Sequence, residues 1–208
     1  MIYNQIQPHK DLADYIDAFW TVQGDGNALQ KQRILPDGCV DLIFNLGADC
    51  KTENRTFSMR SAKTYLIGTM TAAQENFLNA QHKFTGVRFK PSAFPSFFKY
   101  PPLNEVTNKT IEFEAPHAPN IYQVEKDAFS YLNDYFLNQI GRQKNHLCII
   151  LNEIENTRGQ LSVDELIKRN FTTARQLERS FLKYIGITPK EYVKITRFKA
   201  AFAQIKHN

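Results

Sequence analysis

The sequence predicts an α+β protein in which a β-rich N-terminal domain is followed by an all-α C-terminal domain. Three observations predict this arrangement. Between residues 31 and 90, short apolar segments alternate with turns, which is typical of strands. From residue 147 onward, apolar residues recur at helical spacing. The polar, glycine-containing stretch 141–145 separates the two patterns, so we expect one domain over residues 1–140 and a second over 144–208.

Length and composition favour a soluble globular chain. The 208 residues are enough for two modest domains, and the hydrophobic share of 42% is that of an ordinary folded protein. The longest apolar runs are far too short to span a bilayer, and the first residues, MIYNQIQPHKD, lack the regions of a signal peptide. We therefore expect a cytoplasmic protein with no membrane partner.

Three segments carry the clearest strand signals. The turn residues Pro36, Asp37 and Gly38 precede the apolar segment 40–46. The segments 65–69 and 86–90 are similar, and in the second one apolar residues alternate with basic ones, which predicts a strand with one buried face. A sheet or barrel made of such strands needs large side chains to fill it, and six aromatic residues are available: Trp20, Phe44, Phe57, Phe77, Phe84 and Phe89.

The rest of the N-terminal domain is predicted to hold two helices. Ser92 is a candidate N-cap for a short helix over 92–99, and an irregular polar stretch is expected over 104–120. Apolar residues then recur on one side of a predicted helix over 121–140. The pattern leaves open whether this helix packs on its own domain, which is the favoured interpretation, or forms a homodimer.

The C-terminal domain begins with an apolar helical stripe over 147–154. Ser162, with Glu165 three residues later, forms a capping box at the start of a second helix. Thr173 caps a third helix, which Gly186 ends as a left-handed cap. Two short helices joined by three or four residues predict a helix-turn-helix, whose second helix enters the major groove of DNA.

The third helix carries the side chains that suit base reading. Its inner face is formed by apolar residues, which leaves Arg175, Gln176, Glu178 and Arg179 on or beside the outer face. Arginine matches guanine O6 and N7, and glutamate accepts from cytosine N4. Thr173 lies at the positive end of the helix dipole, where a phosphate is favoured. We therefore predict double-stranded DNA as a partner.

Charge is unevenly distributed along the chain. Residues 158–208 contain eleven Lys or Arg and four Asp or Glu, whereas residues 1–157 contain fifteen and seventeen, so the net charges are +7 and −2. A basic segment beside a near-neutral one is expected where only one part of a protein meets a polyanion. A solvated basic surface is the alternative interpretation.

The segment LSVDELIKRNFTTARQLERSFLKYIGITPKEYVKITRFKAA resembles the first helix-turn-helix of the AraC/XylS family of bacterial transcription regulators. Upstream, RILPDGCVDLIFNLG and GVRFKPSAFPSFF are similar to the cupin-like or barrel-shaped sensor domain of a subset of that family. The resemblance implies a sequence-specific DNA-binding regulator that senses a small effector. It places Arg175, Glu178 and Arg179 at base-reading positions and makes 190–206 the start of a long connecting helix.

The chain departs from the family pattern at the turn. Ile167 and Phe171 stand where the family usually has a small residue and a glycine, and Asn170 replaces an apolar residue. The resemblance ends at Asn208, where the family continues into a second helix-turn-helix, so we expect a unit truncated before it. The alternative function is a ligand- or protein-binding module with a vestigial helix-turn-helix.

The remaining polar residues suggest an effector site but no catalytic one. Asp37, Asp41 and Arg88 are candidate anchors for a small effector among aromatic walls, although a turn role for Asp37 and structural roles for the other two are favoured. The three cysteines have no CxxC spacing, and the five histidines have no metal spacing. No nucleophile motif or phosphate loop is present. We therefore expect no metal, no cofactor and no enzyme activity.

Overall fold

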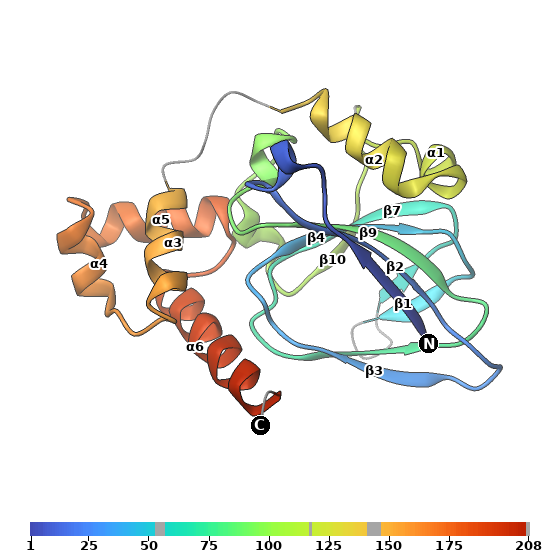
Figure 1. Cartoon of the computed structure of the whole chain (residues 1–208), viewed down its shortest axis with the longest axis horizontal. Helices are drawn as coiled ribbons and strands as arrows, with labels where there is room; N and C mark the ends of the chain where they lie inside the picture. The colour runs from blue at the N-terminus through green and yellow to red at the C-terminus, as the bar shows by residue number, and fades with distance from the viewer. Residues whose placement is uncertain (53–56, 117, 141–146, 207–208) are drawn as a thin grey trace.

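The computed structural model describes residues 1–52, 57–116, 118–140 and 147–206. An N-terminal part made mostly of antiparallel strands is followed by a C-terminal part made of helices (Figure 1). This order confirms the predicted fold class. The segment 141–145, where we expect the domain boundary, lies outside the described residues, so the division into 1–140 and 144–208 stays a prediction.

The main sheet has six antiparallel strands in the order β1-β2-β9-β4-β7-β10. Their bounds are Ile2–Ile6, Ile16–Gln23, Lys83–Phe89, Val40–Asn45, Lys63–Ile67 and Thr110–Glu112. Two smaller antiparallel sheets pair β3 (Gln30–Ile34) with β8 (Gln74–Leu78) and β5 (Cys50–Thr52) with β6 (Phe57–Met59). Strands β4, β7 and β9 confirm the three strands predicted from the sequence.

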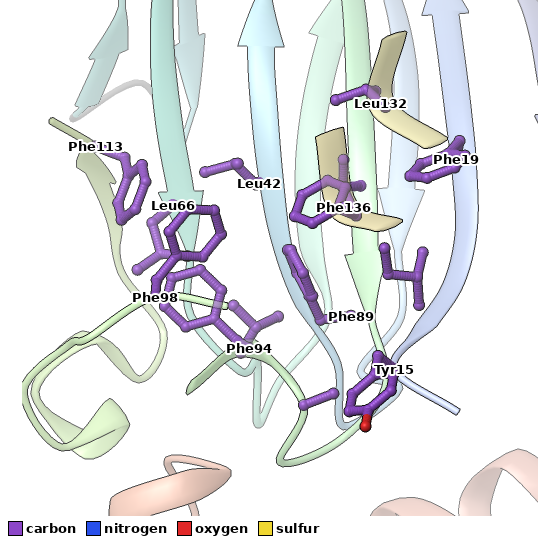
Figure 2. Packing of buried hydrophobic residues seen from close by; sticks show 14 of the residues in the cluster. Tyr15, Phe19, Leu42, Leu66, Phe89, Phe94, Phe98, Phe113, Leu132 and Phe136 are labelled. Carbon is purple, nitrogen blue, oxygen red and sulfur yellow. The ribbon is translucent and has the colours of Figure 1, made fainter. Parts of the chain in front are cut away.

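Alternation along the strands gives the main sheet two different faces. On β4 and β9, one set of alternate residues, which includes Leu42 and Phe89, packs against helix α2 (Ala128–Leu137). Figure 2 shows this core, in which Phe136 of α2 lies over the strands beside Phe89. The rings of Phe89 and Phe136 meet edge to face at 5.6 Å, a favoured aromatic geometry. Helix α2, which lies within the helix predicted over 121–140, therefore packs on the sheet of its own domain.

The opposite face of the main sheet looks toward the two smaller sheets. A separate cluster lies there, built from Trp20, Val22, Cys50, Met59, Tyr65, Leu78 and Phe84. Of the six aromatic residues predicted to fill the interior, Phe44 and Phe89 belong to the α2 side, whereas Trp20, Phe57 and Phe84 belong to this one. Phe77 on β8 is in neither of these two clusters of described residues. The two faces therefore divide the predicted core into two.

Three local predictions in the N-terminal part differ from the structure in their details. The segment 92–99 holds only the short 3₁₀ helix η2 (Phe94–Ser96). Its N-cap is Ala93 and not Ser92, which has a positive φ of +68° and not the extended conformation of an N-cap residue. The stretch 104–120 is not irregular throughout, since η3 (Leu103–Val106) and β10 occupy part of it.

The third difference concerns the helix predicted over 121–140. The chain forms α1 (Ile121–Lys126) and then α2, with Asp127 between them in a non-helical conformation. The Asp127 side chain accepts a hydrogen bond from the amide of Ser130 and so starts α2 as an N-cap. An aspartate can cap a new helix as well as extend an old one, and apolar periodicity does not distinguish the two.

The C-terminal part contains α3 (Leu147–Asn156), α4 (Val163–Arg169), α5 (Ala174–Tyr184) and α6 (Pro189–Lys206). Both predicted caps are confirmed: Ser162 forms a capping box with Glu165, and Thr173 forms one with Gln176. Gly186 follows α5 with a φ of +96°, as its predicted left-handed role requires.

The helix-turn-helix is packed despite its bulky turn. Leu166 of α4 and Leu177 and Phe181 of α5 are buried in one cluster. Asn170 joins α4 to α3 because its Nδ2 donates to Glu153 Oε2 at 2.9 Å and to the Leu166 carbonyl at 2.9 Å. Phe171, where the resemblance leads us to expect a glycine, has a φ of +48° and a side chain that is 98% exposed. The bulky residue is thus accommodated by pointing into solvent.

Replacing Phe171 by glycine is expected to raise the free energy of unfolding by about 0.5 kcal/mol. Relief of the left-handed strain is worth about 1–2 kcal/mol, and the greater freedom of glycine in the unfolded chain offsets about half of it or more. The exposed ring contributes no burial to lose. The midpoint of urea unfolding measures the effect. The matched variant Phe171→Val, which is β-branched at the same φ, should lower the midpoint; a valine variant as stable as the glycine variant would contradict the assignment of strain.

Candidate functional site

A cavity of about 350 Å³ lies between the main sheet and the two smaller sheets. Strands of all three sheets form its wall, and the apolar lining includes Trp20, Ile43, Met59, Ile67, Leu78 and Phe84. Its volume is at the small end of the range that protein cavities offer to small molecules. All three predicted effector-site residues, Asp37, Asp41 and Arg88, line this cavity.

Strand register brings the charged lining residues together. Asp41 on β4 lies directly opposite Arg88 on β9. The Arg88 Nε atom is 3.4 Å from Asp41 Oδ1 and 3.4 Å from Asp37 Oδ2, so one guanidinium faces two carboxylates. Trp20 Nε1 donates a hydrogen bond to Asp41 Oδ1 at 2.9 Å. The three charged residues are predicted from the sequence, but the indole is not, because only the sheet register shows that it reaches Asp41.

The electrostatics of this group reflect its burial. Burial raises the pKa of Asp41, and the neighbouring Arg88 opposes that rise without cancelling it. The Asp41 carboxylate in turn raises the pKa of Arg88. Asp37 also keeps the turn role that the sequence suggested, since its Oδ1 accepts from the amide of Cys39 at 2.9 Å. The cavity therefore has one carboxylate-rich wall, and its other sides mix apolar residues with Gln32, Arg33, Gln74, Asn76 and Thr110.

The same wall touches the helical part of the chain. Lys199 Nζ on α6 donates to the backbone carbonyl of Asp37 at 3.2 Å. Gly38 lies so close to the ring of Tyr192 that a Cβ at this position would be 2.8 Å from Tyr192 Cε2. Asp37 and Arg88 also line a second cavity of about 580 Å³, whose other wall includes Lys199 and Tyr192. The turn at 36–38 is thus in contact with both the first cavity and α6.

Two further contacts join the sheet part to the end of α5. The Thr69 hydroxyl donates to the carbonyl of Ile185, and the Thr107 hydroxyl donates to the carbonyl of Gly186. These carbonyls lie at the C-terminal end of the helix, where backbone acceptors lack helical partners. The sheet part therefore supplies hydrogen bonds that hold the end of α5.

Helix α5 presents the predicted DNA-reading residues to solvent. Thr173, Arg175, Gln176, Glu178 and Arg179 are all exposed. The hydroxyl of Thr173 accepts from the amide of Gln176, and Gln176 Oε1 accepts from the amide of Thr173, so these two side chains are engaged in the cap. No ion pair within the described part of the chain holds Arg175, Glu178 or Arg179. These three side chains are therefore available to a partner.

The described residues give no sign of a metal centre or a membrane span. Within residues 1–52, 57–116, 118–140 and 147–206, no group of three or more His, Cys, Asp or Glu is placed to hold a metal ion. No helix in those ranges is both long and apolar enough to cross a bilayer.

A strand-built part with a cavity is followed by helices that carry a capped helix-turn-helix, and this order of elements matches the fold of a solved AraC-family regulator. The chain is similar in structure to an apo variant of ToxT, an AraC-family transcription regulator from Vibrio cholerae, with a TM-score of 0.51, 9% identity, and coverage of 89% of this chain and 82% of that chain. Residues 4–112 match the family described as a domain of unknown function, DUF6597. The chain belongs to that family.

Two other ToxT structures from Vibrio cholerae show weaker likeness. Wild-type ToxT with a bound unsaturated fatty acid has a TM-score of 0.46 and 9% identity over 98% of this chain and 84% of that chain. A further ToxT structure has a TM-score of 0.46 and 12% identity, and the match covers 91% of this chain and 83% of that chain. No curated protein sequence matches the chain.

Proposed function

We propose that the protein is a sequence-specific DNA-binding transcription regulator of AraC type, with a small effector bound in the sheet part. The observation that carries the proposal is α5, which is capped at Thr173, anchored by Leu177 and Phe181, and exposes Arg175, Glu178 and Arg179. A rigid helix with exposed arginines four residues apart has the chemistry of a major-groove reader.

Each exposed residue of α5 has a proposed role. Arg175 and Arg179 grip guanine O6 and N7, and Glu178 accepts from cytosine N4. Thr173 and Gln176, at the helix start, lie where backbone amides and the helix dipole favour a phosphate. The net charge of +7 over residues 158–208 supports the same partner, because phosphate contacts release counterions.

The cavity is the proposed effector site. Asp37, Asp41 and Arg88 form its polar wall, and the turn that contains Asp37 touches α6 through Lys199. A ligand that contacts Asp37 in this wall is therefore connected to α6 through the turn that contains Asp37. With this role we propose a cytoplasmic protein with a sensor domain over 1–140 and a DNA-binding domain over 144–208.

Fluorescence anisotropy tests the DNA proposal. The protein is titrated into labelled DNA from upstream of its own gene and into a scrambled duplex of the same composition, at several salt concentrations. We expect tighter binding to the upstream duplex and an affinity that falls steeply with salt, because several phosphates are contacted. Equal, weak binding to both duplexes would refute base reading by α5 and favour the alternative of a ligand- or protein-binding module with a vestigial helix-turn-helix.

A further inference from the structure

Four charged residues line the 350 Å³ cavity, and three of them, Asp37, Asp41 and Arg88, form one polar wall. Asp37 and Asp41 both lie 3.4 Å from the same Arg88 atom, so a single guanidinium serves two carboxylates. The Arg88 Nε atom is buried, yet it makes no hydrogen bond of good geometry to either of them. Arg33, the other cation of the lining, has an exposed side chain on β3 and does not pair with the two carboxylates among the described contacts. At this wall two carboxylates therefore face one guanidinium, and Lys199 lies on the other side of the turn, where it donates to the Asp37 carbonyl.

An unpaired acceptor lies in the same lining. Asn76 Oδ1 on β8 is buried, and no residue in the described part of the chain is its hydrogen-bond partner. A buried acceptor left without a donor costs about 1–3 kcal/mol, so a ligand that donates a hydrogen bond there recovers that free energy. The cavity thus offers a carboxylate from one sheet and a free acceptor from another.

Aromatic surface adjoins the carboxylate. The Trp20 indole is tied to Asp41 by its N–H, and the ring of Tyr3 stacks on it with centroids 6.5 Å apart. Both rings line the cavity. The indole packs against Gly86 and is stacked by Tyr3, so the phenol ring of Tyr3 is the aromatic face that can attract a cation here.

From this arrangement we propose that the effector is a small amine with an apolar body, whose protonated amino group binds at Asp41 beside Trp20. The amine brings a positive charge to the two carboxylates that share Arg88, and Asn76 Oδ1 is a further acceptor in the same lining. A carboxylic acid of the same shape is disfavoured, because it brings a third negative charge to a wall with one guanidinium. The term effector rests on the proposed function, whereas the predicted binding of an amine in the cavity does not depend on it.

Three probes of matched shape test the ligand class on the full chain: 3-phenylpropylamine, 3-phenylpropan-1-ol and 3-phenylpropionate. Isothermal titration calorimetry measures each Kd at pH 7. We expect the amine to bind at least about tenfold more tightly than the alcohol or the acid, as a hydrogen bond between charged groups implies. An amine that binds no better than the acid or the alcohol overturns the proposal.

Two variants locate the site. Asp41→Asn keeps the size of the side chain and removes its charge, so the amine should lose about tenfold or more in affinity while the alcohol changes little. Glu75→Gln removes a carboxylate of β8 that pairs with Lys31 and does not line the cavity, so all three probes should bind as to the wild type. An amine affinity that survives D41N overturns the proposal.

The DNA experiment separates this inference from the proposed function. Amine-selective binding together with unselective DNA binding would support the ligand class and refute the regulator. Selective DNA binding together with binding of the acid alone would support the regulator and refute the amine.

Discussion

Replacing Arg88 by methionine is expected to lower the free energy of unfolding by about 3 kcal/mol at pH 7. Removing one partner of a buried ion pair costs about 3–5 kcal/mol, because the other charge is left without compensation. We expect the lower end of this range of free energies, because solvent screens a partly exposed pair: 25% of the Arg88 side chain and 15% of the Asp41 side chain are exposed. Methionine keeps much of the apolar stem, so the loss reports on charge more than on packing.

The decrease in the free energy of unfolding caused by R88M should become smaller as the pH falls. Burial already holds the pKa of Asp41 above its ordinary value, with Arg88 opposing the rise. Without Arg88 that pKa rises further. A carboxyl group whose pKa is higher in the folded than in the unfolded state stabilises the fold at low pH, and this stability is lost as pH rises through the folded value. The R88M variant should therefore approach the wild type as acid protonates Asp41.

Urea unfolding at pH 7.5 and at pH 5 measures this effect. The double variant R88M/D41N should regain most of the stability lost at pH 7.5, because no buried charge remains at position 41. D41N alone serves as its reference. A loss in R88M that is the same at both pH values, and that D41N does not relieve, would mean that the Arg88 stem acts through packing and not through its charge.

Local signals in the sequence predicted the helix-turn-helix with good accuracy. The caps at Ser162 and Thr173 depend on residues three positions away, and each helix is short enough for that local chemistry to determine where it begins. The alternation around Arg88 likewise predicted which of its neighbours are buried, because strand periodicity is a local property.

The cavity could be predicted only in part, since it depends on register between distant strands. Asp41 and Arg88 were recognised as candidates one at a time, but their pairing requires β4 and β9 to be neighbours in the sheet. The contact of Lys199 with the Asp37 carbonyl joins residues from opposite ends of the chain. No local pattern encodes such a contact, which explains why the link between cavity and α6 was missed.

The double variant Arg175→Ala/Arg179→Ala is expected to weaken binding to the upstream DNA by about 30-fold or more. Each bidentate contact of arginine with guanine contributes about 1–3 kcal/mol, and the two residues lie one turn apart on the exposed side of α5. Stability should change little, because both side chains are exposed and alanine favours a helix. Anisotropy with the upstream and scrambled duplexes measures affinity and selectivity together.

A charge-matched control separates base reading from general electrostatics. Lys10→Ala/Lys99→Ala removes the same two positive charges from exposed positions on the sheet part. If α5 reads bases, R175A/R179A loses both affinity and the preference for the upstream duplex, whereas K10A/K99A keeps the preference. If the basic helices only contact phosphates, R175A/R179A binds both duplexes more weakly by the same factor and the selectivity ratio is unchanged. That second result would contradict the assignment of α5 as a reading helix, because phosphate contacts carry no sequence information.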